Sequence, residues 1–208
     1  MLQDLLKRYP VLAACEKEII AAKDMLVACY ENGGKVLLCG NGGSAADADH
    51  IVGELMKGFL KKRSLSPEKQ QEMRKNCPAL TTEVLHKLQG GLPAVSLPSL
   101  SVLNAAVCND TDPALIYAQA VMALGNPHDL LIGMSTSGNA ENICNAVMVA
   151  KGLGLVTIAL TGEGGGKVAH LADITIRVPE IETYKIQELH LPVYHYLCAA
   201  VEAHFFEQ

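Results

Sequence analysis

Apolar residues in the middle of the chain gather into short runs, each followed by a loop that contains glycine, serine or proline. Four runs span residues 35–39, 93–97, 129–134 and 155–160, and a fifth, 173–178, alternates apolar with polar residues. Helical spacing of apolar residues follows most of them. The pattern predicts an α/β fold: a doubly wound, parallel, five-stranded sheet flanked by helices, with the fifth run at its edge. Ligands of such sheets bind beyond the carboxyl ends of the strands.

Both ends of the chain predict helices. Apolar residues recur at steps of three and four through the first 32 residues, and the two glycines that follow suit a helix terminus. Pro10 suits the first turn of a helix, so we expect N-terminal helices within residues 1–34 that restart at this proline. A last long helix is predicted from about residue 182 to residue 206.

A basic segment at residues 60–92 interrupts the alternation of strands and helices. It holds seven Lys or Arg and three Glu, a net +4, whereas the whole chain carries −5 and the remainder therefore −9. Ser66 and Thr81 begin sequences that are typical of helix starts. We therefore predict a helical insertion. Two interpretations stay open for it: a solvated surface excursion, and a substrate lid or oligomer contact.

The composition restricts the class of protein. The chain of 208 residues fits one domain, 1–208, and can bury a sizeable core. Hydrophobic residues make up 50% and charged residues 19%, which excludes a disordered chain. A net charge of −5 argues against a nucleic-acid partner, since a dedicated nucleic-acid binder shows a basic excess.

The cysteines and the N-terminus bear on the compartment. None of the seven cysteines forms a C-x-x-C motif, so neither a zinc finger nor a redox dithiol is indicated. Cys39 and Cys108 stand in apolar runs, and we expect the cysteines to be reduced core residues. The N-terminus carries Asp4 and no apolar core of a signal peptide, and no apolar run can span a bilayer. These features predict a cytoplasmic protein with no membrane partner.

The loop after the first predicted strand, Asn41-Gly42-Gly43-Ser44, is a candidate ligand site. Its glycines let the backbone approach a ligand closely, and the start of the following helix can bind an anion. Ser44 with Asp47 three residues later is typical of a helix cap. The loop matches neither the P-loop nor the dinucleotide fingerprint, and a plain strand-to-helix turn is an alternative interpretation.

The loop after the third predicted strand offers three hydroxyls, on Ser135, Thr136 and Ser137. Together with backbone N–H groups and the following helix they can donate several hydrogen bonds to one phosphate. Neither this loop nor the glycine loop contains Lys or Arg, which favours a neutral phosphate site over a nucleoside triphosphate site. A role limited to capping and turning the chain is the alternative.

Two pairs of residues have the donor atoms of a metal site. His50 and Glu54 are four residues apart and share one helix face, whereas Gln187 and His195 are eight apart, about 80° around a helix. Such nitrogen and oxygen donors suit zinc or a related divalent ion. A surface hydrogen bond between His50 and Glu54 explains that pair equally. Between the second pair, His190 is expected to make ordinary helix-surface or subunit contacts, and support of a neighbouring metal ligand is the alternative.

Four motifs occur in one order along the chain: CGNGGSAADADHIVGEL, STSGN, LTGEGGG and IQELHLPVYHYL. Together they resemble the sugar isomerase (SIS) domain proteins, most closely the bacterial phosphoheptose isomerases, over nearly the whole chain except residues 60–92. The resemblance implies a flavodoxin-like SIS fold. It also implies an aldose–ketose isomerisation that interconverts sedoheptulose 7-phosphate and a heptose 7-phosphate.

The resemblance implies roles for particular residues. Four match the family's zinc ligands: His50, Glu54, Gln187 and His195. Others match positions that bind the substrate: Asn41, Gly42, Gly43 and Ser44 in the glycine loop, the sugar-contacting pair Asn109 and Asp110, Ser135, Thr136 and Ser137 in the phosphate loop, and Gln187 beside the sugar. The family assigns the base to Glu54 and the acid to His195. It also implies a homotetramer with sites between subunits and with N-terminal helices packed at its centre.

Three departures from the family pattern bear on the substrate. Ala140 stands where the phosphate loop usually has a further serine, Tyr184 stands where an aspartate is usual, and the insertion 60–92 replaces a shorter segment. Two alternatives therefore stay open. One is a non-catalytic phosphosugar-binding, adaptor or regulatory protein, and the other is an isomerase acting on a pentose or hexose phosphate.

Overall fold

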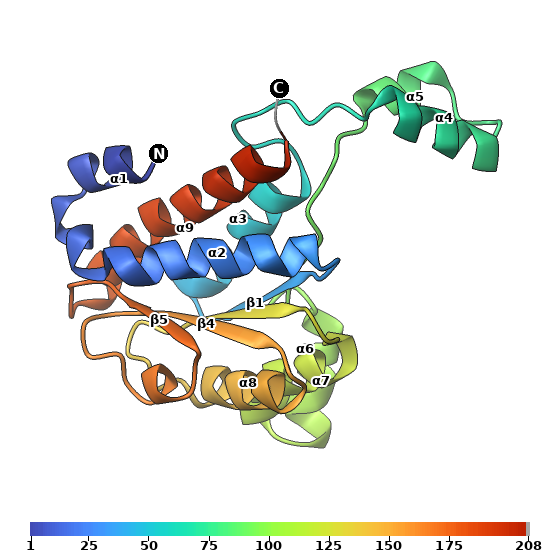
Figure 1. Ribbon diagram of the computed structural model, residues 1–208. Helices are drawn as coiled ribbons and strands as arrows, with labels where there is room; N and C mark the ends of the chain where they lie inside the picture. The colour runs from blue at the N-terminus through green and yellow to red at the C-terminus, as the bar shows by residue number, and fades with distance from the viewer. Residues whose placement is uncertain (207–208) are drawn as a thin grey trace.

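The computed structural model describes residues 1–206 and contains a parallel five-stranded sheet with helices on both faces (Figure 1). The strand order along the sheet is β2-β1-β3-β4-β5. The strands are β1 Val36–Gly40, β2 Ala94–Ser96, β3 Leu130–Met134, β4 Val156–Thr161 and β5 Ile174–Arg177. All five lie within the runs predicted from the sequence or end one residue beyond them, and β5 lies at the edge as expected, so the predicted fold class is confirmed.

Alternate residues of the central strands supply two cores. Leu38 and Ile132 point to a face covered by the two ends of the chain and by the helix that follows β1. The elements on that face are α1 Leu2–Arg8, the 3-10 helix η1 Pro10–Cys15, α2 Glu16–Glu31, α3 Gly43–Met56 and α9 Thr183–Phe205. The restart at Pro10 occurs as predicted, but its first turns form a 3-10 rather than an α-helix.

The opposite face of the sheet buries Leu37 and Leu131. The elements that cover it are α6 Ser101–Asp110, η2 Pro113–Leu115, α7 Ile116–Leu124, α8 Glu141–Gly152 and η3 Val168–His170. The sequence predicted α8 but gave no element for residues 98–128. Only Val107 is buried in α6, so that helix lacks the apolar stripe that would reveal it.

The insertion forms two short helices, α4 Pro67–Asn76 and α5 Thr82–Lys87, that stand away from the sheet (Figure 1). Ser66 and Thr81 cap them by accepting hydrogen bonds from backbone N–H groups three residues on, which confirms both predicted helix starts. No residue of α4 is buried. We call the protruding segment 65–88 the arm.

The cysteines are all free within the described residues, but not all belong to the core. Cys77 in the arm and Cys108 in α6 are exposed, so the expectation of buried cysteines is wrong for these two. The apolar run around Cys108 misled because α6 turns that side chain toward solvent. Among residues 1–206 the structure has no helix with the length and apolar character needed to span a bilayer.

Candidate active site

The glycine loop makes a close turn between β1 and α3 that side chains would obstruct. A Cβ on Gly40 would lie 2.5 Å from the Ser44 backbone oxygen, and one on Gly43 would lie 2.7 Å from the Gln187 amide. Gly42 has a φ of +55°, which favours glycine. The glycines therefore allow the start of α3 to pack directly against the start of α9.

Asn41 connects this loop to the loop of residues 135–140, here called the hydroxyl loop. Its amide pairs with the amide of Asn142 through two hydrogen bonds of 2.9 Å, and Asn142 lies in the first turn of α8. The Tyr117 hydroxyl donates to the Gly40 carbonyl (2.7 Å) and contacts Asn41. The structure thus brings together the two loops that the sequence predicted to bind substrate.

Ser44 does not cap α3. Gly42 occupies the N-cap position, and Ser44 is buried with its backbone N–H bonded to the Asn41 carbonyl. Asp47 instead accepts a hydrogen bond from Tyr194 on α9. The predicted cap is wrong because the positive φ of Gly42 starts the helix two residues earlier.

The hydroxyl loop between β3 and α8 keeps donors available. Ser135 is buried, whereas Ser137 is exposed and Thr136 is half-buried. The Gly138 carbonyl accepts from Val168, and the close contact of Gly138 with Gly165 and Gly166 leaves no room for a Cβ. The glycine turn of residues 164–166 therefore supports the hydroxyl loop from behind.

Ala140 is the N-cap of α8 and makes no side-chain capping bond. Its backbone N–H lies 3.5 Å from the Ser135 hydroxyl oxygen. The N-terminus of an α-helix offers unpaired N–H groups and the positive end of the helix dipole. The loop is thus suited to an anion.

His50, Glu54 and His195 form a second polar group, here called the His50 cluster. His50 Nε2 lies 3.1 Å from Glu54 Oε1 and 3.5 Å from His195 Nε2. The i, i+4 spacing on α3 sets the first contact, and the alignment of α3 with α9 sets the second. The side chain of His50 is 43% exposed and that of Glu54 is 16% exposed, so solvent or a ligand can reach them.

Tyr194 orients the His50 ring. Its hydroxyl donates to Asp47 Oδ1 (3.0 Å), so it can only accept from His50 Nδ1, also 3.0 Å away. Burial, and next the charge of Asp47, raise the pKa of Tyr194, which keeps this proton in place. With a proton on Nδ1, the Nε2 atom of neutral His50 turns its lone pair toward Glu54 and His195.

Burial, and next the nearby His50, lower the pKa of His195, which favours its neutral form. Burial raises the pKa of Asp47. With both rings neutral, the facing atoms of the His50 cluster would present lone pairs to one another, and a proton or a cation between them would join them. Such a set of nitrogen and oxygen atoms is of the kind that binds zinc.

The pairwise spacing also suits zinc. Bonds of about 2.0–2.1 Å place neighbouring ligand atoms of a tetrahedral site about 3.3–3.4 Å apart, between the 3.1 and 3.5 Å contacts of the cluster. Across the described part of the chain, no three His, Cys, Asp or Glu side chains form a group that could hold a metal ion. The His50 cluster thus consists of two pairwise contacts, both to His50. Its donor types and pair spacings suit zinc, but its three side chains do not form a closed group of ligands.

The remaining candidates lie apart from the His50 cluster. Gln187 packs on Gly43 at the start of α3, and Asn109 bonds to its neighbour Asp110 (2.7 Å) at the end of α6. Among the residues described, none of these three side chains has a hydrogen bond to the cluster. Tyr184, in the first turn of α9, is 57% exposed.

The two regions are joined by α3 and α9, which run side by side in the same direction. Gln187 meets Gly43 at their start, and Tyr194 meets Asp47 and His50 further along. At 1.5 Å per residue, Glu54 lies about 16 Å along α3 from Gly43. One chain therefore holds the loops and the His50 cluster at separate points of the same helix pair.

His190 was expected at the surface and is instead fully buried. Its Nε2 lies 3.3 Å from the Thr161 carbonyl at the end of β4, and burial lowers the pKa of His190 to about 4. A neutral His190 thus ties α9 to the sheet. The signal that sequence reasoning missed is its place on the apolar stripe of α9, four residues from Ile186 and from Tyr194.

Comparisons with known proteins agree with this architecture. A model of the SIS domain matches residues 3–90 and 89–162. A phosphoheptose isomerase of Helicobacter pylori is 38% identical over 181 residues, 87% of this chain and 81% of that protein. One from Rhodospirillum rubrum is 38% identical over 191 residues, 92% of this chain and 88% of that protein.

Solved structures give the same result. A phosphoheptose isomerase from Francisella tularensis superposes with a TM-score of 0.76 at 34% identity, covering 93% of this chain and 90% of that one. Another from Neisseria gonorrhoeae gives 0.74 at 30% identity, covering 98% and 100%. The chain belongs to the SIS domain family and, within it, to the family of the phosphoheptose isomerases.

Proposed function

We propose that this chain is a sugar-phosphate isomerase that interconverts an aldose and a ketose, with a seven-carbon sugar phosphate as its substrate. The observation that carries the proposal is the His50 cluster, in which Glu54 and His195 both approach Nε2 of the His50 ring while Tyr194 holds Nδ1 of that ring. The names and extent of similarity of the relatives support the substrate class.

The reaction needs a base, an acid and a group that stabilises a developing oxyanion, because a proton moves between adjacent carbons through an enediol. We assign the base to Glu54, whose carboxylate has one polar contact among the residues described, at 3.1 Å to His50. We assign the acid to His195. The N–H of an imidazole can donate a hydrogen bond to a sugar oxygen, and the imidazolium form, which gains and loses its proton near neutral pH, can give that oxygen a proton.

The substrate phosphate is proposed to bind at the hydroxyl loop. Ser135, Thr136 and Ser137 offer hydroxyls at the start of α8, and the pairing of Asn41 with Asn142 joins the glycine loop to this site. Donors held by a helix start bind an anion without a Lys or Arg. Asn109 and Asp110 are proposed contacts to the sugar.

One zinc ion or a similar divalent metal is proposed as the cofactor. His50, Glu54 and His195 would close around it from their present pairwise contacts, and Gln187, which lies apart from them within one chain, is the fourth proposed ligand. A bound metal polarises sugar oxygens and stabilises negative charge on them. Coordination would also lower the basicity of Glu54, so the base function requires this carboxylate to have a free oxygen.

A homotetramer with sites between subunits is part of the proposal. The separation of the loops from the His50 cluster along α3 supports a site that takes groups from two chains. A cavity of about 260 Å³ lies beside His195, and residues of α1 and α9 line it. Leu5 and Leu191 are among its apolar lining residues, which suits contact with another subunit.

The experiment is turnover of sedoheptulose 7-phosphate by purified protein incubated with zinc, together with metal analysis of wild type and of His195→Ala. We expect turnover, and about one metal ion per chain in the wild type that is lost in the variant. Binding of the sugar phosphate without turnover would instead identify a phosphosugar-binding protein. Turnover of a pentose or hexose phosphate alone would keep the isomerase and reject the seven-carbon substrate.

A further inference from the structure

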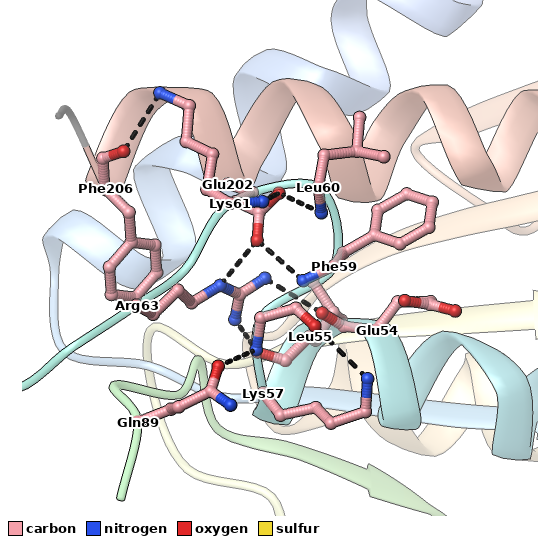
Figure 2. Close-up of polar contacts among 11 residues, drawn as sticks. Glu54, Leu55, Lys57, Phe59, Leu60, Lys61, Arg63, Gln89, Glu202 and Phe206 are labelled. Carbon is pink, nitrogen blue, oxygen red and sulfur yellow. Dashed lines mark hydrogen bonds and ion pairs between the residues drawn. The ribbon is translucent and has the colours of Figure 1, made fainter. Parts of the chain in front are cut away.

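A fully buried ion pair lies at the far end of α3 and α9 from the loops. Arg63 and Glu202 are each 1% exposed, and Arg63 Nε donates to Glu202 Oε1 at 2.8 Å (Figure 2). Taking two charges out of water is costly unless hydrogen bonds satisfy the rest of both groups. The remaining contacts of the pair therefore indicate what it holds in place.

The Glu202 carboxylate collects the backbone of the segment that leaves α3. Its oxygens accept from the N–H groups of Phe59 (2.8 Å), Leu60 (2.7 Å) and Lys61 (3.1 Å) in addition to Arg63. Burial disfavours the charged carboxylate, but these bonds outweigh burial and hold the pKa of Glu202 below its usual value. The segment 59–61 is therefore wrapped around one carboxylate.

The Arg63 guanidinium closes the end of α3. It donates to the backbone carbonyls of Glu54 (Nη2, 2.9 Å) and Leu55 (Nη1), which lie in the last turn of the helix. The residue after α3, Lys57, is extended rather than left-handed, so the helix ends without a glycine cap. Arg63 supplies donors to carbonyls that such a cap would otherwise satisfy.

Arg63 and Glu202 each hold a residue that belongs to the His50 cluster or packs against it. The Glu54 carbonyl that Arg63 holds belongs to the proposed base itself. The Phe59 ring, fixed through its N–H by Glu202, packs against the His195 ring with centroids 5.6 Å apart. His195 and Glu202 are seven residues apart on α9, two helical turns, so one rigid helix carries both.

The same pair forms the base of the arm. The Arg63 carbonyl accepts from the Gly90 N–H (2.7 Å), and Ser64 bridges Gln89 across the two chain segments that lead to the arm. The Phe206 ring stacks on the Arg63 guanidinium at 4.6 Å. The pair therefore lies between the arm and the last turn of α3, and it ties both to α9.

We propose that Arg63 and Glu202 are positioning residues for the isomerase: by clamping the end of α3 and the segment 59–61 to α9, they set Glu54 and Phe59 relative to His195. This inference rests on the proposed function. In this proposal, neither Arg63 nor Glu202 touches the substrate. Their effect is carried by the Glu54 backbone and by the Phe59 ring.

The test compares Glu202→Gln and Arg63→Lys with a control of equal burial. Gln keeps the shape and one acceptor oxygen, and Lys keeps the charge but loses the fork that reaches two carbonyls and a carboxylate. Asp129→Asn is the control. Asp129 is 3% exposed and accepts from the backbone N–H groups of Lys35 (2.9 Å) and Asn126 (2.7 Å), at the amino-terminal ends of β1 and β3.

Two readouts are measured at a temperature where every variant is folded. The first is kcat and KM: we expect kcat to fall at least tenfold in Glu202→Gln and less in Arg63→Lys, with KM within twofold. The second is the ring-to-ring nuclear Overhauser effect between Phe59 and His195, which should weaken in both variants. Asp129→Asn should keep the kcat and the ring contact of the wild type.

The outcomes separate this inference from the proposed function. Wild-type kcat and an intact ring contact in folded Glu202→Gln and Arg63→Lys would overturn the positioning role and leave the pair as a structural element only. An equal loss of kcat in Asp129→Asn would overturn it as well. If the wild type turns over no sugar phosphate, the proposed function fails, and the ring contact alone then decides whether the pair positions Phe59 on His195. If Glu202→Gln does not fold, Arg63→Lys carries the test.

Discussion

Two polar groups lie about two turns apart on the same pair of helices, and their hydrogen bonding differs sharply. In the His50 cluster, the Glu54 carboxylate has a single polar contact within the described residues, to His50, and both side chains reach solvent. At the Arg63–Glu202 pair, one carboxylate accepts four donors and both side chains are buried. A carboxylate with free lone pairs is available to a ligand or a proton, whereas one with none left fixes the backbone around it.

The difference predicts opposite consequences of removing each charge. The His50 cluster is called the open group and the Arg63–Glu202 pair the saturated group. Loss of charge at the open group should affect chemistry and leave the free energy of unfolding nearly unchanged. Loss of charge at the saturated group should affect folding first, because it leaves a buried partner and three backbone N–H groups without their acceptor. The four predictions that follow test this division, starting with the largest expected effect.

Glu54→Gln should lower kcat for the sugar phosphate by about 10²–10⁴-fold, because Gln cannot take a proton from carbon and general bases contribute about that much. The free energy of unfolding should change by less than about 0.5 kcal/mol, since among residues 1–206 the carboxylate has one polar contact, to His50. Steady-state kinetics and urea denaturation of the same preparations check both numbers. Wild-type turnover in this variant would show that the catalytic base lies elsewhere.

Glu202→Ala should lower the free energy of unfolding by about 3–5 kcal/mol, the usual cost of leaving one partner of a buried ion pair uncompensated. Denaturant titration at neutral pH measures it. The matched control is Glu83→Ala, whose ion pair with Lys87 has both side chains 75% exposed and should contribute less than about 0.5 kcal/mol. Equal effects in the two variants would contradict the contrast between open and saturated groups.

The same prediction has a pH dependence with a definite sign. The pKa of Glu202 is lower in the folded chain than the value of about 4.3 for an unfolded glutamate. Its contribution is therefore fully present above about pH 4.3 and is lost as the pH falls through the folded pKa. The stability difference between wild type and Glu202→Ala should shrink on acidification below pH 4.3, and a difference that grew instead would reverse the sign.

Tyr194→Phe should weaken zinc binding about 10–100-fold, the usual cost of losing a hydrogen bond that orients a metal-binding histidine. Without the hydroxyl, His50 Nδ1 loses its partner and the ring is free to present either nitrogen. Competition with a zinc-chelating dye measures the affinity. Tyr196→Phe, two residues along α9, is the control that should leave it unchanged, and unchanged affinity in Tyr194→Phe would remove this tyrosine from the site.

The fold and much of the site's composition could be predicted from the sequence, because each strand is a short apolar run and the motifs are local. The convergence of the motifs could not be predicted. That Asn41 pairs with Asn142, or that His195 meets His50, depends on how α3, α8 and α9 align across the sheet. Residue spacing within one element says nothing of such alignments.

The Arg63–Glu202 pair shows what the sequence still offered and what it hid. Glu202 continues the stripe of Tyr194 and Cys198 at steps of four on a helix whose stripe is buried, so a charge there indicated a buried partner. Arg63 gave no such sign, since it stands among basic residues of a segment interpreted as an insertion. Only the return of the chain past the end of α3 places its guanidinium beside Glu202.

Ala140→Ser is expected to have the smallest effect of the four variants. It tests the hydroxyl loop, the second region whose polar groups are available to a ligand. Ala140 is the N-cap of α8 and makes no capping bond, so a serine there should stabilise the protein by about 1 kcal/mol. Its hydroxyl would also add one donor for a phosphate, which should lower KM by up to about tenfold, equivalent to about 1.5 kcal/mol. Thermal unfolding and kinetics measure both.

Ala105→Ser is the control, at an exposed interior position of α6, and it should lower stability slightly and leave KM unchanged. If Ala140→Ser gains stability but KM stays the same, the loop caps the helix without holding the phosphate, and the contrast between open and saturated groups would then apply to the His50 cluster alone.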